Sequence, residues 1–218
     1  MKLLSAVAIA LAIGSCEGVA PGNELPDETE CLRLRVYDQA DVPIGILGRA
    51  LGETSRILAA SGIKTVWDIR DANSPENESR AMDFSAFSMD PSVDTRNFLL
   101  VRFVRIGSSD PRHNALAFSL PAARYGAHVT VYFDRAEEVS LVVPPRLPKI
   151  LANILAHEIG HVLLGSGGHS DSGIMKAVWT RADYQRIAAE YLKFLPQEAV
   201  AMRNEVSRRA ALSSVSRP

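Results

Sequence analysis

Cysteine is scarce in this chain of 218 residues, which contains only Cys16 and Cys31. Two cysteines cannot build a disulfide framework, so we do not expect one to hold the fold together. An excess of charge is also missing, because the formal net charge is -1. This balance gives no long-range attraction for nucleic acids or anionic membranes, and we expect neither as a partner. The length favours a single domain, and a hydrophobic content of 47% is ordinary for a globular protein.

A hydrophobic run long enough to span a bilayer as a permanent helix is not evident. The apolar run at residues 3–13 follows the basic start Met1-Lys2 and has the length of a signal-peptide core. The next stretch is acidic and rich in Pro and Gly, which is typical of a linker. We therefore predict a signal peptide over 1–15, a linker over 16–30 and one domain over 31–218, so that the protein is exported.

Two cleavage routes are open for the signal peptide. Ile13-Gly14-Ser15-Cys16 resembles a bacterial lipobox, which would make Cys16 the lipidated first residue of the mature protein. Alternatively, Ala12-Ile13-Gly14 offers small residues at the two positions that a general signal peptidase reads, and Cys16 would then be free to pair with Cys31. Lipidation is slightly favoured, and it would be the only contact with a membrane. The expected location is the periplasm, the cell envelope or the extracellular space.

Hydrophobic periodicity predicts a mixed sheet with helices in front of it, followed by a helical C-terminal third. Pro148 suits a first helical turn, and Thr180 with Asp183 three residues later suits a helix cap. Residues 70–96 show little periodicity and are expected to form a loop. We expect strands at 31–37, 63–69, 97–106, 116–119 and 128–133, and helices at 41–62, 148–164, 180–193 and 196–212.

The sequence His157-Glu158-Ile159-Gly160-His161 lies within the third expected helix. Histidines four residues apart project from one helix face and can hold one ion, and neutral imidazole suits zinc. Glu158 is placed to take a proton from a water molecule bound to that ion. The alternative is a helix with two surface histidines. It is disfavoured because the flanking residues are apolar, and a buried His or Glu needs a compensating partner.

The residues after this helix supply a third ligand and a methionine. Residues 165–168 (GSGG) can turn the chain sharply and return His169 towards the metal, and Met175 follows six residues later. The whole stretch HEIGHVLLGSGGHSDSGIM resembles the metzincin clan of zinc peptidases, with its HExxHxxGxxH ligands and methionine turn. The resemblance implies an α+β fold, an active-site helix, zinc as cofactor and Met175 as the floor of the site. It extends loosely to uncharacterised exported bacterial proteins over 31–212.

This sequence departs from the metzincin pattern in the loop before the third ligand. His169 stands eight residues after His161, whereas the clan has its third histidine six residues after the second. Three candidates for the third ligand therefore stay open. His169 is preferred because it matches the other two ligands, Asp171 could supply an oxygen, and Glu190 lies on a later helix.

A second, weaker resemblance lies upstream. Residues 116–121, followed by a strand that ends at Phe133-Asp134, are similar to the edge-strand region of matrixin-type enzymes, where this strand pairs with an extended substrate. The alternative is a plain sheet edge without a ligand. His113 and His128 lack metal-type spacing and are assigned to the surface or to satisfied hydrogen bonds rather than to a metal. Trp67 and Trp179 are assigned to packing rather than to a binding platform.

The expected function is a monomeric zinc metalloendopeptidase that acts on peptides or proteins, with Glu158 as general base and with His157, His161 and His169 as zinc ligands. The second hypothesis is a catalytically silent, zinc-stabilised envelope binding protein, because the irregular loop could close the metal off from substrate. No serine elbow, phosphate-binding glycine loop or zinc-ribbon cysteine pair is visible in the sequence.

Overall fold

The computed structural model describes residues 31–71, 98–106, 115–121, 127–144, 146–165 and 168–215. The expected signal peptide and linker lie outside these residues, as do Cys16, His113 and nearly all of the expected loop at 70–96. None of the helices in the described ranges has the length and apolar character needed to cross a membrane.

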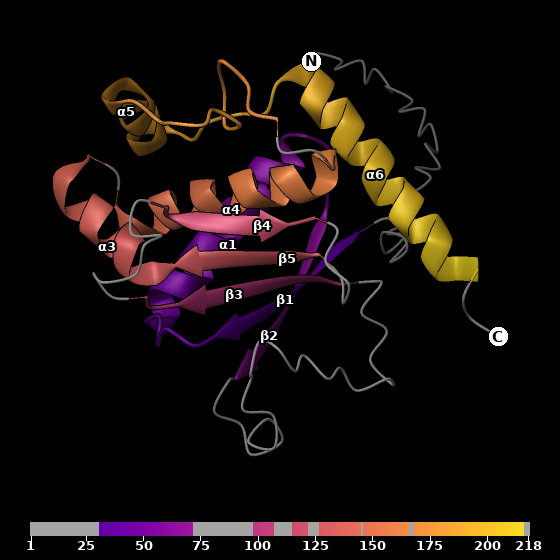
Figure 1. Ribbon diagram of the computed structural model, residues 1–218, viewed down its shortest axis with the longest axis horizontal. Coiled ribbons are helices and arrows are strands. Elements are labelled where there is room, and N and C mark those ends of the chain that lie inside the picture. Colours follow the sequence, from indigo (N-terminus) through magenta and orange to yellow (C-terminus); the bar gives the residue numbers. More distant parts are fainter. Residues whose placement is uncertain are drawn as a thin grey trace, which may run out of the picture.

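A five-stranded mixed sheet forms the centre of the domain (Figure 1). Its strands run in the order β2-β1-β3-β5-β4, and all are parallel except β4, which pairs antiparallel with β5. Strand β4 therefore forms one edge of the sheet and lies alongside helix α4. The strands are β1 (Leu32–Asp38), β2 (Thr65–Asp71), β3 (Leu99–Val104), β4 (Ala117–Leu120) and β5 (His128–Tyr132).

The core lies on one face of this sheet. In β1, Leu32, Leu34 and Val36 are buried while the residues between them are partly exposed, which is the period-two pattern of a strand with one covered face. Helices α1 and α4 pack against each other, and their apolar sides join the strands in one hydrophobic cluster. This cluster fixes α4 against the sheet, and α4 carries the candidate site.

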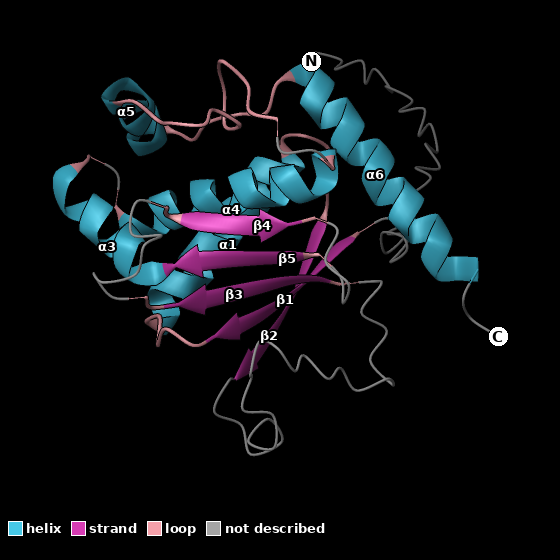
Figure 2. Ribbon diagram, viewed as in Figure 1, coloured by secondary structure: helices cyan, strands magenta, loops and turns pink. Residues whose placement is uncertain are grey.

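Five helices belong to the described part (Figure 2). Helix α6 packs against α4. Helix α5 precedes α6 in the chain and lies at the opposite side of the molecule in Figure 1. Helix α3 follows β5 directly and was not expected from the sequence; Phe133, predicted as the end of a strand, begins this helix. The helices are α1 (Ile44–Ala59), α3 (Phe133–Val142), α4 (Leu147–Leu164), α5 (Arg181–Ala189) and α6 (Pro196–Val215).

Local signals at the helix ends act as the sequence indicates. Pro148 lies in the first turn of α4, where its missing N–H costs no hydrogen bond. Thr180 and Asp183 form a complete capping box at the start of α5. Helix α4 ends at Gly165, whose φ of 76° is left-handed and whose N–H donates to the carbonyl of His161. Glycine adopts this conformation at little cost, so the chain can leave α4 in a new direction at this point.

Candidate functional site

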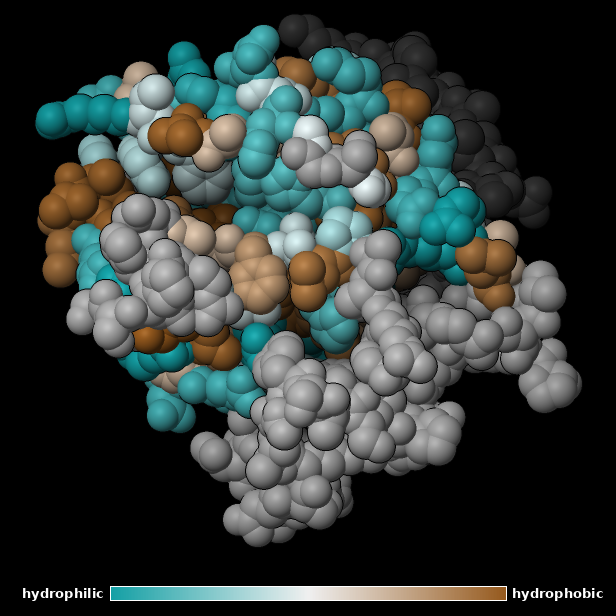
Figure 3. Space-filling view, in the orientation of Figure 1, coloured by the Kyte–Doolittle hydropathy of each residue, from teal (hydrophilic) through white to brown (hydrophobic). Residues whose placement is uncertain are grey.

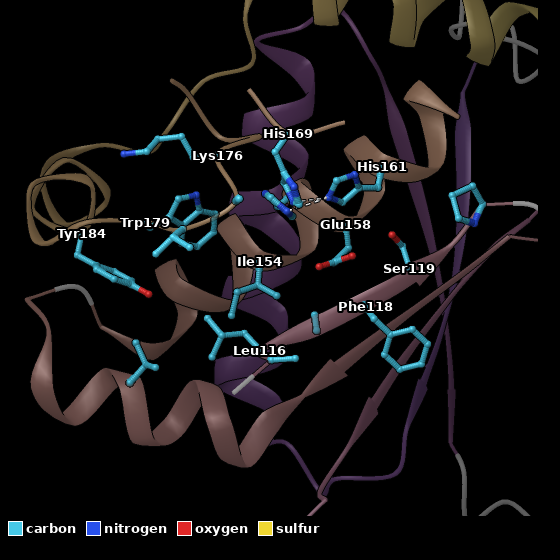
Figure 4. Close-up of a pocket in the computed structure, with 17 residues that line it drawn as sticks. Leu116, Phe118, Ser119, Ile154, Glu158, His161, His169, Lys176, Trp179 and Tyr184 are labelled. Carbon is cyan, nitrogen blue, oxygen red and sulfur yellow. Dashed lines mark hydrogen bonds between the residues drawn. The ribbon is translucent and has the colours of Figure 1, made fainter. Parts of the chain in front are cut away.

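Three histidines converge at the C-terminal half of α4 (Figure 4). His157 and His161 come from one face of the helix, and His169 comes from the segment after Gly165. The Nε2 atom of His161 lies 3.0 Å from Nε2 of His157 and 3.2 Å from Nε2 of His169. One ligand atom from each residue lies within 4.8 Å of both others. These spacings bring three ring nitrogens around a single point.

The donor set of this cluster fits a metal ion such as zinc. A tetrahedral ion with bonds of about 2.0–2.1 Å separates its ligand atoms by about 3.3 Å, close to the spacings found here. The Nδ1 atom of His157 lies 2.7 Å from the carbonyl oxygen of Ile174, to which it can donate. In that tautomer Nε2 keeps its lone pair, and a second-shell hydrogen bond of this kind is usual for a ligand histidine.

The electrostatics of the cluster favour neutral imidazoles. Burial lowers the pKa of His157, and the nearby His169 acts in the same direction. Burial, with His157 and His169, lowers the pKa of His161 to about 4. Both rings are therefore neutral at pH 7, which is the form that binds a metal. The Nδ1 atom of His161 is buried without a hydrogen-bond partner among the described residues.

Met175 is fully buried and lies against Gly160 of α4. A Cβ atom placed on Gly160 would stand 2.5 Å from the sulfur of Met175 and 2.8 Å from Cε1 of Phe194. Only glycine fits at that place without a shift of these neighbours, so the segment after His169 packs directly against α4. Met175 therefore packs against the helix that carries two of the three histidines.

Glu158 lies beside the histidines and faces β4 across the cleft (Figure 4). Its side chain is buried, with 8% of the residue exposed. Burial raises the pKa of its carboxyl group to about 7, while a hydrogen bond with Ser119 on β4 acts in the opposite direction. A carboxyl group with a pKa near neutrality can both accept and return a proton at physiological pH.

A cavity of about 660 Å³ opens beside the cluster and includes His157, Glu158, His161 and His169 in its lining. Beyond the histidines its walls are mainly apolar, and they come from β4, α3, α4, α5 and the segment after Met175. Helix α3 also exposes Leu141 and Val142. Figure 3 shows hydrophobic surface at its left edge, on the side where α3 lies. The apolar walls include Leu116, Val139, Ile154, Val178, Trp179 and Tyr184.

The two other candidates for a third ligand lie outside the histidine cluster. Asp171 is exposed, and Glu190 is exposed at the end of α5, where its carboxylate lies 3.3 Å from Nζ of Lys193. His128 begins β5 and is not part of the cluster either. Among the described residues, the three histidines alone form a group with metal-ligand spacing.

Several residues of the cavity were not expected from the sequence. Trp179 was assigned to packing. Its ring does pack edge-to-face on the ring of His157, with 5.8 Å between the ring centroids, and it also lines the cavity. Its indole N–H donates to the carbonyl of Ile174, which His157 also contacts. Tyr184 and Lys176 line the same cavity. The only sequence feature that links these two residues to the site is their position soon after Met175, because neither has a spacing that indicates a functional role.

Comparison with known proteins supports the fold. No protein-family model matches the sequence, and no curated protein matches it. Among solved structures, the chain is similar to the archaemetzincin of Methanopyrus kandleri, with a TM-score of 0.54 and 14% sequence identity. The match covers 84% of this chain and 100% of that one. The expected fold class is therefore confirmed: an α+β, metzincin-like domain with a mixed sheet and a helical C-terminal part.

Proposed function

We propose that this protein is a zinc-dependent metallopeptidase. The observation that carries the proposal is the convergence of three imidazole nitrogens next to the buried carboxyl group of Glu158, at the edge of a cavity. Three protein ligands with one open position are typical of a catalytic zinc site. The likeness of the fold to an archaemetzincin supports the same conclusion.

In this proposal His157, His161 and His169 hold the zinc ion, and Met175 forms the floor beneath them. Zinc, when bound, supplies Lewis acidity, which lowers the pKa of a coordinated water and stabilises negative charge on the substrate carbonyl oxygen. Glu158 accepts the proton of the attacking water and returns it to the leaving amine. A positive charge nearby favours the ionised carboxylate, which the reaction requires at the start.

The substrate in this proposal is an extended peptide that lies along β4. This strand is at the edge of the sheet, and it contributes Ala117, Phe118 and Ser119 to the cavity lining. A strand edge binds peptide through main-chain hydrogen bonds and reads only alternate side chains. A peptide paired along a strand edge can continue on both sides of the bond that is cut, which suits cleavage within a chain and hence an endopeptidase.

The cavity also bears on the second hypothesis, a silent zinc-stabilised binding protein. That hypothesis depends on a loop that closes the metal off from substrate. The cavity reaches all three histidines and Glu158, which supports access for a peptide and favours hydrolysis.

Export, with Cys16 as a lipid anchor, remains part of the proposal. In a cell that exports the protein, Cys16→Ala should release it from the membrane or block its maturation.

The test combines metal analysis with peptide cleavage. The purified protein should contain one zinc ion and cut members of a broad peptide library at defined positions, and a chelator should stop the cleavage. Glu158→Gln should keep the zinc and lose turnover, because the amide cannot accept the proton. Undiminished turnover in Glu158→Gln would remove that residue from the role of base. Full zinc occupancy without any cleavage by the parent would favour the silent binding protein.

A further inference from the structure

The segment that carries His169 raises a specific structural problem. His157 and His161 are fixed by their places on α4, but His169 is exposed and belongs to no helix or strand. A ligand outside helices and strands depends on contacts with other parts of the chain to keep its position. A separate contact is needed to fix the position of His169.

That contact is made by the next residue, Ser170. Its backbone N–H donates to the carbonyl of Met175 at 2.9 Å, which closes the segment between the third histidine and the methionine. Its hydroxyl group donates to Oε1 of Glu198, a residue in the first turn of α6. Ser170 therefore ties the His169 segment both to the methionine and to a helix 28 residues further along the chain.

Glu198 is well placed to hold this segment. The residue is 7% exposed, and its second carboxylate oxygen, Oε2, accepts the backbone N–H of Leu195 at 2.7 Å. Both oxygens are thus occupied, one by the metal-binding segment and one by the start of α6. The adjoining main chain adds a parallel link, since the N–H of Ile174 donates to the carbonyl of Lys193 at 2.9 Å.

We propose that Ser170 and Glu198 are positioning residues that hold His169 in its metal-binding place. The inference rests on the proposed zinc site. Helix α6 thereby becomes part of the metal centre, because its first turn supplies an anchor for the segment that carries His169. Outer partners of ligand residues typically contribute about 10- to 100-fold to metal affinity, and we expect an effect of that order here.

The test measures zinc affinity by competition with a chromophoric chelator, in the full chain, for the parent and four variants. Ser170→Ala removes the hydrogen bond from the Ser170 hydroxyl to Glu198 but keeps the hydrogen bond between Glu198 and Leu195. This variant should lower zinc affinity about 10-fold or more. Glu198→Met removes both acceptors and should lower it at least as much. Glu198→Gln should stay near the parent, because its carbonyl can accept from Leu195 and its amide can donate to the Ser170 hydroxyl.

Glu205→Gln is the matched control. Glu205 also lies on α6, but its carboxylate pairs with Arg208 and Arg209 rather than with any residue of the described part of the His169 segment. Zinc affinity should be unchanged in this variant. Each protein is also melted without metal, and the cobalt-substituted forms are compared by visible absorption. A looser His169 should change the ligand-field bands of Ser170→Ala, which a mere loss of stability would not do.

The outcomes separate this inference from the proposed function. A parent chain that binds no zinc refutes the metal site itself. A parent that binds zinc, together with a folded Ser170→Ala that binds it equally well and shows the same cobalt spectrum, overturns the positioning role and leaves the peptidase proposal standing. If Glu198→Met does not fold, Ser170→Ala alone decides the question.

Discussion

Gly160 offers the sharpest test of the packing beneath the candidate site. An alanine is ordinarily preferred to glycine inside a helix by about 0.8–1 kcal/mol. At Gly160, however, a Cβ atom would lie 2.5 Å from the sulfur of Met175 and 2.8 Å from Cε1 of Phe194. Both distances are far below a normal contact, and Met175 is fully buried, so it cannot simply turn outwards.

The expected cost of Gly160→Ala follows from these two effects. Overpacking a well-packed core typically costs about 1–3 kcal/mol, and the helix preference offsets about 1 kcal/mol of it. We expect the free energy of unfolding to fall by up to about 2 kcal/mol, which lowers Tm by up to about 8 °C for a domain of this size. Zinc affinity should fall as well, because movement of Met175 shifts Ile174, whose carbonyl contacts His157.

Gly52→Ala is the control for this experiment. Gly52 lies on the exposed side of α1, and a Cβ atom there would meet nothing within 4 Å. The same substitution should therefore raise the free energy of unfolding by about 0.5–1 kcal/mol. Thermal melts in excess chelator give both values for the metal-free protein. A Gly160→Ala variant as stable as Gly52→Ala would refute the close packing of Met175 under the helix.

Three further predictions concern acid stability, the cavity and the metal. Burial raises the pKa of Asp183, but hydrogen bonds from Lys176 and Thr180 outweigh burial and lower this pKa from 3.8 to about 2. The ionised carboxylate therefore stabilises the fold by about 2 kcal/mol above about pH 4, and this stabilisation should disappear towards pH 2. The difference in Tm between the parent and Asp183→Asn should close over the same pH range. Leu116→Trp should reduce the cavity volume. In a panel of matched peptide substrates, the variant should raise KM for peptides with large side chains more than for peptides with alanine. An equal rise in KM for both kinds of peptide would contradict the assignment of Leu116 to the wall of the substrate cavity. Zinc at 1,000 times its Kd stabilises the parent by about 4 kcal/mol, and its removal should cost the parent that amount. In paired thermal melts with and without zinc, the change in Tm should be much smaller for His169→Ala. Equal changes in Tm for the parent and the variant would exclude His169 as a ligand.

The sequence by itself determined the features that depend on neighbours within a few residues. The alternation of β1 and the apolar stripe of α4 appear where the periodicity places them. Thr180 caps α5 as expected, since the partner of its side chain is only three residues away. The spacing of His157 and His161 also required nothing but a helix, because a separation of four residues puts both side chains on one face.

Features without a local signal were decided by the tertiary structure. Helix α3 begins directly after β5, and its N-cap residue Tyr132 makes no side-chain capping bond, so the sequence carried no mark of its start. The third histidine depended on contacts across the fold: the sequence left His169, Asp171 and Glu190 open, and the folded chain brings only His169 to the other two. Its segment is held by Glu198, a residue 28 positions from Ser170.

The cavity shows the same division. Its walls come from β4, α3, α4, the segment after Met175 and α5, which lie apart in the chain. Trp179 appeared in the sequence as an ordinary packing residue, and only its contact with His157 places it at the site. Helix and strand periodicity reflects hydrogen bonds between near neighbours, whereas a cavity depends on how separate elements pack, and no short stretch of sequence contains that information.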